Sequence, residues 1–306
     1  MRRFRWLALS LLQALACDPS MGPASESESV TESESVTESE SVTESESAPE
    51  SESDLPVGLL SHQTLQSQCD AGDLSRCVTL AERYRKGAGV PRDPERALEL
   101  HHGACARGAG TACADLGLMY QDGDGVPADP GRARELYTQA CEGDGPRGCS
   151  RLSALYLKGI GVARDTARAL AYAQRGCDGG DSLGCTNLGL MLRRGDGVPA
   201  DRAAAAQAFH RGCVRGEGRA CALLAEQYAS GEGVQRNPEL ARMYNGKGCH
   251  LGAGRACGNL GVSHQTGFGA ERDPRRAAHY FRKACELGES RYCQLLQRFE
   301  TGAATR

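Results

Sequence analysis

The sequence predicts an all-α solenoid of repeated helical hairpins, and three observations carry that prediction. Cysteines recur at intervals of 36 residues, a second set follows each of the first by eight, and helix start and stop signals recur at fixed offsets. A fixed period of this size indicates units that stack and bury their apolar faces on one another. The cysteines are Cys69, Cys105, Cys141, Cys177, Cys213, Cys249 and Cys285, followed by Cys77, Cys113, Cys149, Cys185, Cys221, Cys257 and Cys293.

The first recurring signal is a helix start. One position of each repeat holds Asp or Asn, and Pro follows it in four copies. An Asp at the N-cap accepts backbone N–H bonds, and Pro at the next position gives up an N–H that had no partner. We call this predicted helix, which runs to the next repeat's first cysteine, helix B. The cap positions are Asp93, Asp129, Asp165, Asp201, Asn237 and Asp273.

The second predicted helix, helix A, carries the second cysteine of each pair. Leucine always stands three residues after that cysteine, a small residue stands four after it in six of the seven copies, and tyrosine often stands seven after it. These positions form one stripe on a helix, so they are predicted to pack together. Helix A then ends at a Gly-x-Gly-Val turn in most copies, which completes an αα-hairpin.

These motifs resemble a known family. Leu116-Gly-Leu-Met-Tyr120, Gly123-Asp-Gly-Val126 and Asp129-Pro-Gly-Arg-Ala133 are similar to the Sel1-like repeat, and the paired cysteines to its cysteine-rich bacterial branch, typified by the Helicobacter cysteine-rich proteins. The resemblance covers residues 69–300 or so. It implies a right-handed superhelix of antiparallel helix pairs, related to tetratricopeptide arrays, with helix A lining the concave side.

Two segments precede the repeats. Residues 1–17 combine a basic start with a short apolar run, as in a signal peptide, and Ala14-Leu-Ala-Cys17 resembles a lipobox in which Cys17 would be lipidated. Ordinary cleavage and secretion is the alternative. Residues 18–61 hold twelve acidic residues and no Lys or Arg, so we expect a disordered acidic tether, with the repeat domain at 62–306. Both readings place the protein in the bacterial cell envelope or outside the cell.

The cysteine pairs are predicted to form seven local disulfides, because the spacing is constant and the leader is secretory. Each bridge closes a loop of nine residues, which the chain-entropy relation values at roughly 2.5 kcal/mol. Zinc is the rival interpretation, but its sites favour shorter spacings and four converging ligands. We therefore expect no metal and no other cofactor.

Motifs for covalent chemistry are mostly absent from the sequence. None of the lysines at 86, 158, 247 and 283 lies three residues after a serine, as the Ser-x-x-Lys pattern of serine β-lactamases requires. His264 replaces a recurring tyrosine, so we expect it to be a packed aromatic substitute, and we expect His101 and His102 at the surface. The repeat region has 33 basic and 27 acidic residues in mixed order, which argues against nucleic acid.

Positions +2, +6 and +9, counted from the cysteine of helix A, vary between repeats and are predicted to lie opposite the packing stripe. Amides there would bind a peptide backbone, methionines would add adaptable apolar contacts, and the excess of cations would favour an acidic or C-terminal carboxylate ligand. Solvated-surface drift explains the variation equally well, and the resemblance favours a groove. The candidates are Arg83, Asp115, Met119, Arg151, Asn187, Met191, Gln227 and Asn259.

The predicted function is therefore that of a monomeric scaffold, lipid-anchored through Cys17 or secreted, which binds a protein or an extended peptide along the concave helix-A face. The alternative is a weak penicillin-binding or β-lactamase-like hydrolase, as described for cysteine-rich members of the family that the repeats resemble.

Overall fold

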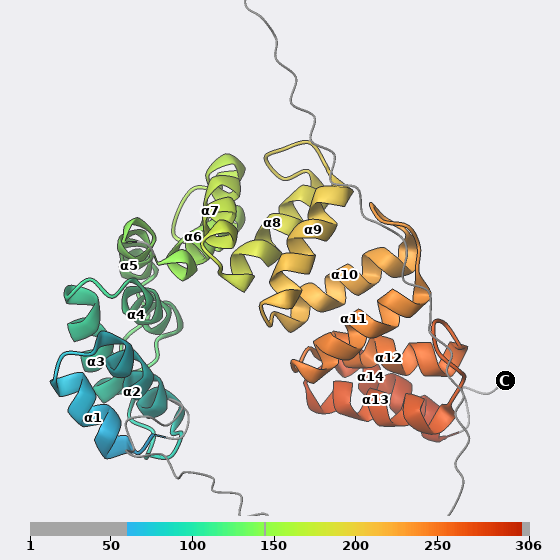
Figure 1. Ribbon diagram of the computed structural model, residues 1–306, viewed down its shortest axis with the longest axis horizontal. Coiled ribbons are helices and arrows are strands. Elements are labelled where there is room, and N and C mark those ends of the chain that lie inside the picture. The colour runs from blue at the N-terminus through green and yellow to red at the C-terminus, as the bar shows by residue number, and fades with distance from the viewer. Residues whose placement is uncertain (1–59, 144, 302–306) are drawn as a thin grey trace, which may run out of the picture. The chain divides into compact units, whose positions relative to one another are not determined.

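The computed structural model describes residues 60–143 and 145–301, and within them the chain forms fourteen helices and no strand (Figure 1). The helices are α1 (His62–Asp70), α2 (Leu74–Lys86), α3 (Pro94–Ala106), α4 (Gly110–Asp122), α5 (Pro130–Glu142), α6 (Pro146–Lys158), α7 (Thr166–Asp178), α8 (Ser182–Arg194), α9 (Arg202–Val214), α10 (Gly218–Ser230), α11 (Pro238–His250), α12 (Gly254–Thr266), α13 (Pro274–Glu286) and α14 (Ser290–Glu300). Even-numbered helices are the predicted helices A, and odd-numbered helices are the predicted helices B.

Helix B begins where the sequence predicts. The six Asp or Asn residues of the recurring position are the N-caps of α3, α5, α7, α9, α11 and α13, and each side chain accepts a backbone N–H. Helix A ends as predicted too. Its C-cap is a glycine in the left-handed region in α2, α4, α6, α8, α10 and α12. Local sequence therefore sets both ends of the hairpin.

All fourteen repeat cysteines form the seven predicted local disulfides. Each bridge joins the end of a helix B to the following helix A, between cysteines eight positions apart in the sequence, with Cα–Cα distances between 4.3 Å and 4.8 Å. Twelve of the cysteines are buried, and only Cys285 and Cys293 are half-buried. We call this side of the array the disulfide edge.

The opposite side, which we call the loop edge, contains the Gly-x-Gly-Val turns. Arginines at one loop position hold these turns by donating from Nε to a carbonyl near the end of helix A. Arg92 contacts Arg85 O, and Arg164 contacts Leu157 O, each at 3.1 Å. The guanidinium groups also reach the next repeat, where Arg92 pairs with Asp124 and Arg236 lies over the Phe268 ring.

Consecutive helices form antiparallel hairpins that stack in chain order (Figure 1). From α4 to α12, each even-numbered helix also contacts the next even-numbered helix, whereas the odd-numbered helices approach one another less. The even-numbered helices therefore line the inner side of the row, as the resemblance implies.

Core packing alternates from repeat to repeat, which the sequence analysis did not predict. In repeats two, four and six, a glycine of helix A faces an aromatic ring of helix B. A Cβ built on Gly117 would lie 2.7 Å from Tyr137 Cε1, and one on Gly189 would lie 2.5 Å from Phe209 Cε1. In repeats one, three and five, helix A has a residue larger than glycine, and the facing residue of helix B is smaller than Tyr137 or Phe209. Those pairs are Ala81 and His101, Ser153 and Ala173, and Ala225 and Asn245.

His101 corrects one prediction and His264 confirms another. His101 is fully buried, because it occupies the helix-B position that Tyr137 and Phe209 occupy in other repeats, and burial lowers its pKa. Its expected place at the surface was wrong, although His102 is exposed. His264 is buried and stacks on Tyr280 with a centroid distance of 5.7 Å, as expected of an aromatic substitute.

The predicted signal peptide and lipidated Cys17 lie outside the described residues, as does nearly all of the predicted tether. Its last two residues belong to the fold. Leu60 is 2% exposed, and Ser61 caps α1 by accepting the N–H of Thr64. The folded part therefore begins at least two residues before the predicted boundary.

Candidate binding face

The surface of interest is formed by positions −2, +2, +5 and +9 of the even-numbered helices, counted from each helix's cysteine, and we call it the helix-A face. At about 100° per residue, these four positions lie within about 40° of the direction opposite the cysteine. The exposure of the first and last of these positions agrees with this geometry. Position +9 is exposed in every copy from α2 to α12, and position −2 is exposed in all of them except α8.

Position +6 does not belong to this face, which corrects the prediction for three candidates. Met119, Met191 and Gln227 are each 1% exposed or less. The reason is geometric, since +6 lies about 60° from the centre of the face, on the flank that packs against the preceding hairpin. Met119 packs on Ala81 and Ala97 in this way. These three residues are core residues and cannot line a groove.

The two asparagines at +2 are already engaged. Asn187 is 7% exposed, and its Nδ2 donates to Ser150 O at 3.1 Å. Asn259 is half-buried, donates to Asn245 Oδ1 at 3.4 Å and accepts from Tyr292 Oη at 3.0 Å. Asn187 therefore links α8 to α6. Asn259 also belongs to a hydrogen-bonded network, but its side chain remains partly accessible.

The remaining candidates lie on α2, α4 and α6, and Arg83, although it stands at +6, is only half-buried. Arg83, Asp115 and the exposed Lys86 line one hollow of about 400 Å³, and Arg83 Nη1 also donates to Leu60 O at 2.7 Å. Glu82 lies there too. Burial by itself would raise the pKa of Glu82, but hydrogen bonds from Arg85 and Lys86 outweigh it and lower this pKa to about 2. Arg151 is half-buried, with its Nε buried and without a hydrogen-bond acceptor.

Arginines at −2 are the residues that the sequence analysis missed. Four helices have an exposed arginine there, namely Arg147, Arg219, Arg255 and Arg291. The sequence carries a signal for them, because these arginines recur in register with the cysteines. Position −2 lies one helical turn before +2, so the arginines extend the helix-A face toward the disulfide edge.

Two of these arginines join neighbouring helices A. Arg147 Nη1 lies 2.6 Å from Asp115 Oδ1, which links α6 to α4. Arg255 Nη2 lies 2.7 Å from Glu226 Oε1, which links α12 to α10, and Arg193 Nη1 lies 3.6 Å from the other oxygen of Glu226. These pairs neutralise Asp115 and Glu226 on this face. In the described part of the chain, Arg194 and Arg219 are exposed and make no ion pair.

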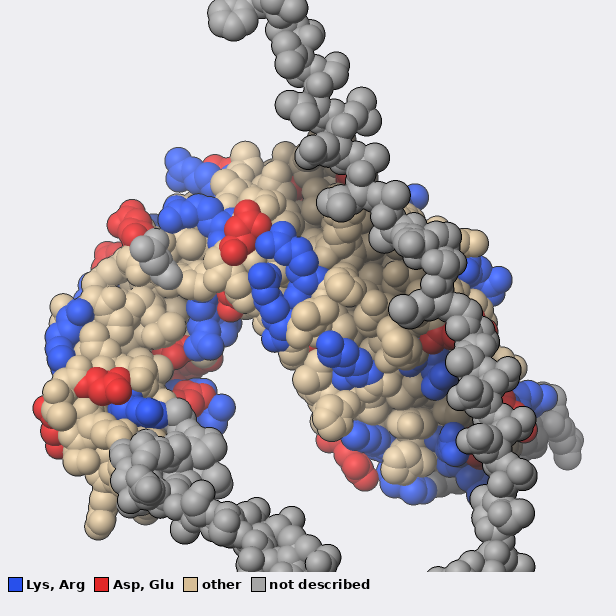
Figure 2. All heavy atoms as spheres, viewed as in Figure 1, with Lys and Arg blue, Asp and Glu red and all other residues tan. Residues whose placement is uncertain are grey.

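Cations therefore dominate the helix-A face from α6 to α12. Figure 2 shows Lys and Arg side chains gathered over the middle of the row of helices, with Asp and Glu side chains beside some of them. A second hollow, of about 340 Å³, lies among α8, α10 and α12, with Arg193, Arg194, Arg219 and Arg255 in its lining. A third, of about 490 Å³, separates α10 from α12. The face thus combines positive charge with several depressions.

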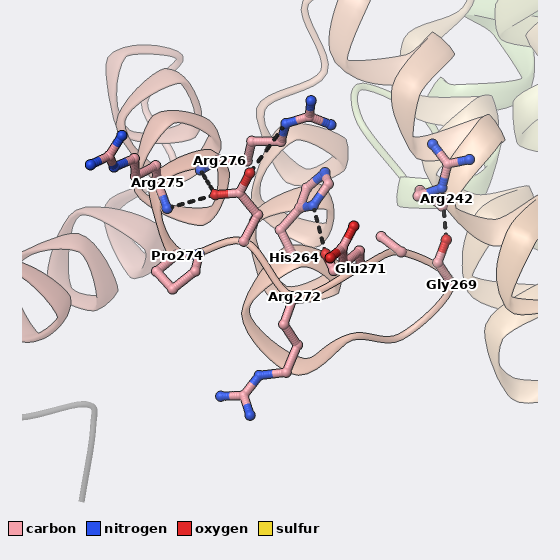
Figure 3. Close-up of a pocket in the computed structure, with 10 residues that line it drawn as sticks. Arg242, His264, Gly269, Glu271, Arg272, Pro274, Arg275 and Arg276 are labelled. Carbon is pink, nitrogen blue, oxygen red and sulfur yellow. Dashed lines mark hydrogen bonds and ion pairs between the residues drawn. The ribbon is translucent and has the colours of Figure 1, made fainter.

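A further hollow of about 700 Å³ lies on the loop edge, at the turn from α12 to α13 (Figure 3). Its polar groups bond to one another. Asp273 accepts the backbone N–H groups of Arg275 and Arg276, and Arg242 Nε donates to Gly269 O at 2.7 Å. The N-terminus of α13 is therefore capped by the protein's own carboxylate.

Within residues 60–143 and 145–301, no cluster of three or more His, Cys, Asp or Glu side chains is placed to hold a metal ion. The same residues include no helix that is both long and apolar enough to cross a membrane.

The sequence matches the Sel1 repeat in six segments, at residues 78–108, 110–145, 146–181, 182–211, 218–252 and 254–289. These segments cover more than half of the chain, so the protein belongs to the Sel1 repeat family. Its seven disulfides fit the cysteine-rich branch and indicate an oxidising compartment outside the cytoplasm. Sel1 repeats generally mediate protein–protein interactions. Among curated proteins, none matches the sequence.

Solved structures support the same fold. A Sel1 repeat protein from Oxalobacter formigenes is 27% identical with a TM-score of 0.64, over 74% of this chain and 99% of that one. The protective antigen c5321 of uropathogenic Escherichia coli, which displays an SLR fold, is 26% identical with a TM-score of 0.61 over 80% of this chain. This chain spans about half of c5321, 52% of its length. The immunity protein Pa5087 of Pseudomonas aeruginosa, at 19% identity and a TM-score of 0.53 over 71% of this chain and 82% of that one, shares the fold alone.

Proposed function

We propose that the protein is a scaffold that binds an acidic polypeptide segment along the helix-A face. The observation that carries the proposal is the row of exposed cations at −2 and +9, which includes Arg194 and Arg219, on a face with few acids. Exposed guanidinium groups attract carboxylates over several ångströms and orient them through paired N–H donors. No covalent step is part of this function.

The test is capture of partners from envelope extracts by the full-length oxidised protein. Reversing two exposed charges, Arg194→Glu with Arg219→Glu, should reduce capture and its dependence on salt. The matched control reverses two exposed arginines of helix B, Arg132→Glu with Arg168→Glu, and should leave capture unchanged. Equal losses in both variants would show that net charge, rather than this face, determines binding.

The hydrolase alternative is tested in the same preparation with a chromogenic β-lactam. The binding proposal expects no saturable turnover. Turnover by pure protein that survives both pairs of charge reversals would replace the scaffold with an enzyme.

The proposal also includes anchoring of the scaffold through a lipid on Cys17, with a monomeric repeat array held beyond the membrane. Replacing Cys17 with Ala should move the protein from the membrane fraction to the soluble envelope fraction. A mature wild-type protein without an acyl mass would favour ordinary secretion, and light scattering would show whether it is a monomer.

A further inference from the structure

The hollow between α10 and α12 exists because one recurring side chain is missing. Three junctions of the array are equivalent, between repeats one and two, three and four, and five and six. At the first, Met119 packs on Ala81 and Ala97. At the second, Met191 packs with Ala169 and Ala173. Both methionines are 1% exposed or less and fill the space beside their alanines, so these two junctions are closed at this position. The hollow of about 400 Å³ at the first junction lies beside that position, because Glu82, Lys86 and Asp115 line it and Met119 does not.

The third junction has serine in the place of the methionine. Ser263 is equivalent to Met119 and Met191, and the residues around it are as small as those of the other junctions. Ala225 and Ala241 stand where Ala81 and Ala97 stand at the first. Position +8 is also smallest here, with Ala229 instead of Arg85 or Leu157. The result is the hollow of about 490 Å³, which all these residues of repeats five and six line.

Polar groups form one side of this hollow. Ser263 Oγ donates to Asn259 O at 3.0 Å, and Asn259 Nδ2 donates to Asn245 Oδ1 at 3.4 Å. Asn245 takes the position that an aromatic ring occupies in repeats two, four and six. The lining also includes two apolar side chains, Val262 and Phe268, and Arg236 lies over the Phe268 ring with its guanidinium carbon 5.2 Å from the ring centroid. The pocket therefore combines room for a ring, an aromatic neighbour and amides that can hydrogen-bond a hydroxyl.

The charged residues next to the pocket indicate which residues would flank a bound ring. The neighbouring hollow among α8, α10 and α12 is lined by Arg193, Arg194, Arg219 and Arg255 and by one acid, Glu289, while Glu226 lines the pocket itself. Glu226 already pairs with Arg255 and Arg193. Arg194 and Arg219 are exposed and are the cations of this group that remain available to a partner's carboxylates.

We propose that this pocket binds a tyrosine side chain from an acidic segment of the polypeptide partner, so that the partner's ring fills the space that methionine fills in the first two junctions. The inference rests on the proposed function and adds one residue type to the ligand. The variant Ser263→Met restores the methionine of the other junctions, so it should close the pocket and raise the melting temperature.

The probes are fluorescein-labelled pentapeptides with two glutamates on each side of a central Tyr, Phe or Ala, titrated with the full-length oxidised protein in a polarisation assay. The Tyr peptide should bind at least about tenfold more tightly than the Ala peptide, with Phe between them. Ser263→Met should remove that difference and leave the Ala peptide unaffected. The matched control Met191→Leu, at the equivalent position of a closed junction, should preserve it.

Three results would overturn the inference, namely equal affinity for the Tyr and Ala peptides, an unchanged Tyr preference in Ser263→Met, and no binding of either peptide. Failure of the tyrosine pocket can be distinguished from failure of the proposed function. If Arg194→Glu with Arg219→Glu abolishes binding of both peptides while Ser263→Met changes nothing, the charged face stands and only the tyrosine pocket is excluded. If the charge reversals leave partner capture intact, the proposed function itself is wrong.

Discussion

The two edges of the array connect successive helices by different kinds of bond. At the disulfide edge, a covalent bond ties each helix B to the next helix A, and the same cysteine spacing recurs in all seven copies. At the loop edge, left-handed glycines, Asp caps and loop arginines hold the chain without any covalent link. The contacts there vary from repeat to repeat. Variation is thus tolerated where many small contacts share the task, and not where a single bond performs it.

The largest expected effect comes from breaking the disulfide edge. Reducing all seven bridges should lower the melting temperature and broaden unfolding, because each bridge contributes roughly 2.5 kcal/mol by the chain-entropy relation and couples adjacent repeats. Replacing Cys177 and Cys185 with Ser in the middle should uncouple the array more than replacing Cys285 and Cys293 near its end. Calorimetry measures both. Free thiols in the oxidised protein would contradict the premise.

The second effect tests close approach at the loop edge. Gly89 and Gly233 have the same φ of +74°, but nothing lies within 4 Å of a Cβ built on Gly89, whereas one built on Gly233 would lie 2.3 Å from the backbone of Arg202. Gly89→Ala should cost about 1 kcal/mol through backbone strain, and Gly233→Ala about 1–2 kcal/mol more through the clash. Chemical denaturation compares them. Equal costs would mean that the loop does not contact the preceding repeat.

A third effect separates the edges by pH. The backbone N–H of Arg276 lowers the pKa of Asp273, which caps α13, below its usual value near 3.8. Its stabilising contribution is therefore present above the unfolded pKa and is lost as the pH falls below that value. The disulfide edge makes no such contribution, because disulfide-bonded cysteines do not titrate. Asp273→Asn keeps the cap, as Asn237 does naturally, and should remove this acid-sensitive contribution. An unchanged acid-unfolding curve in the variant would contradict the assignment.

The smallest effect concerns ion pairs across the loop edge. Arg164 Nη2 lies 3.5 Å from Asp196 Oδ1, and the arginine is 60% exposed. A double-mutant cycle with Arg164→Ala and Asp196→Ala should give a coupling free energy below about 0.5 kcal/mol that disappears at high salt. A coupling several times larger would mean that this edge depends on charge rather than on backbone geometry.

Local signals made the fold predictable. The caps at Asp93 and Asp201, the left-handed glycines and the cysteine spacing each act within one turn of chain, so they recur in the sequence as they do in space. Packing across repeats was harder. Whether +6 faces solvent depends on where the neighbouring hairpin lies, which no local pattern specifies, and Met119 was misplaced for that reason.

The hollow at Ser263 was harder still to predict, because it arises from a difference between equivalent positions. The sequence shows Met119, Met191 and Ser263 in register, but only the packed structure shows that the first two fill a space and the third leaves it open. Repeat proteins permit this comparison inside one chain, since their copies serve as controls for one another.

The alternation between repeats limits which insertions and deletions of repeats the fold can accept. Gly117 with Tyr137 and Gly189 with Phe209 recur every two repeats rather than every one, and the loop arginines that reach Asp124 and Asp196 follow the same double step. The structural unit that recurs with the same packing is therefore two repeats, or 72 residues, long. Excising or duplicating one such module keeps the contacts between repeats in register, such as Arg92 with Asp124 and Met119 with Ala81, whereas shifting the array by a single repeat sets two unlike junctions against each other.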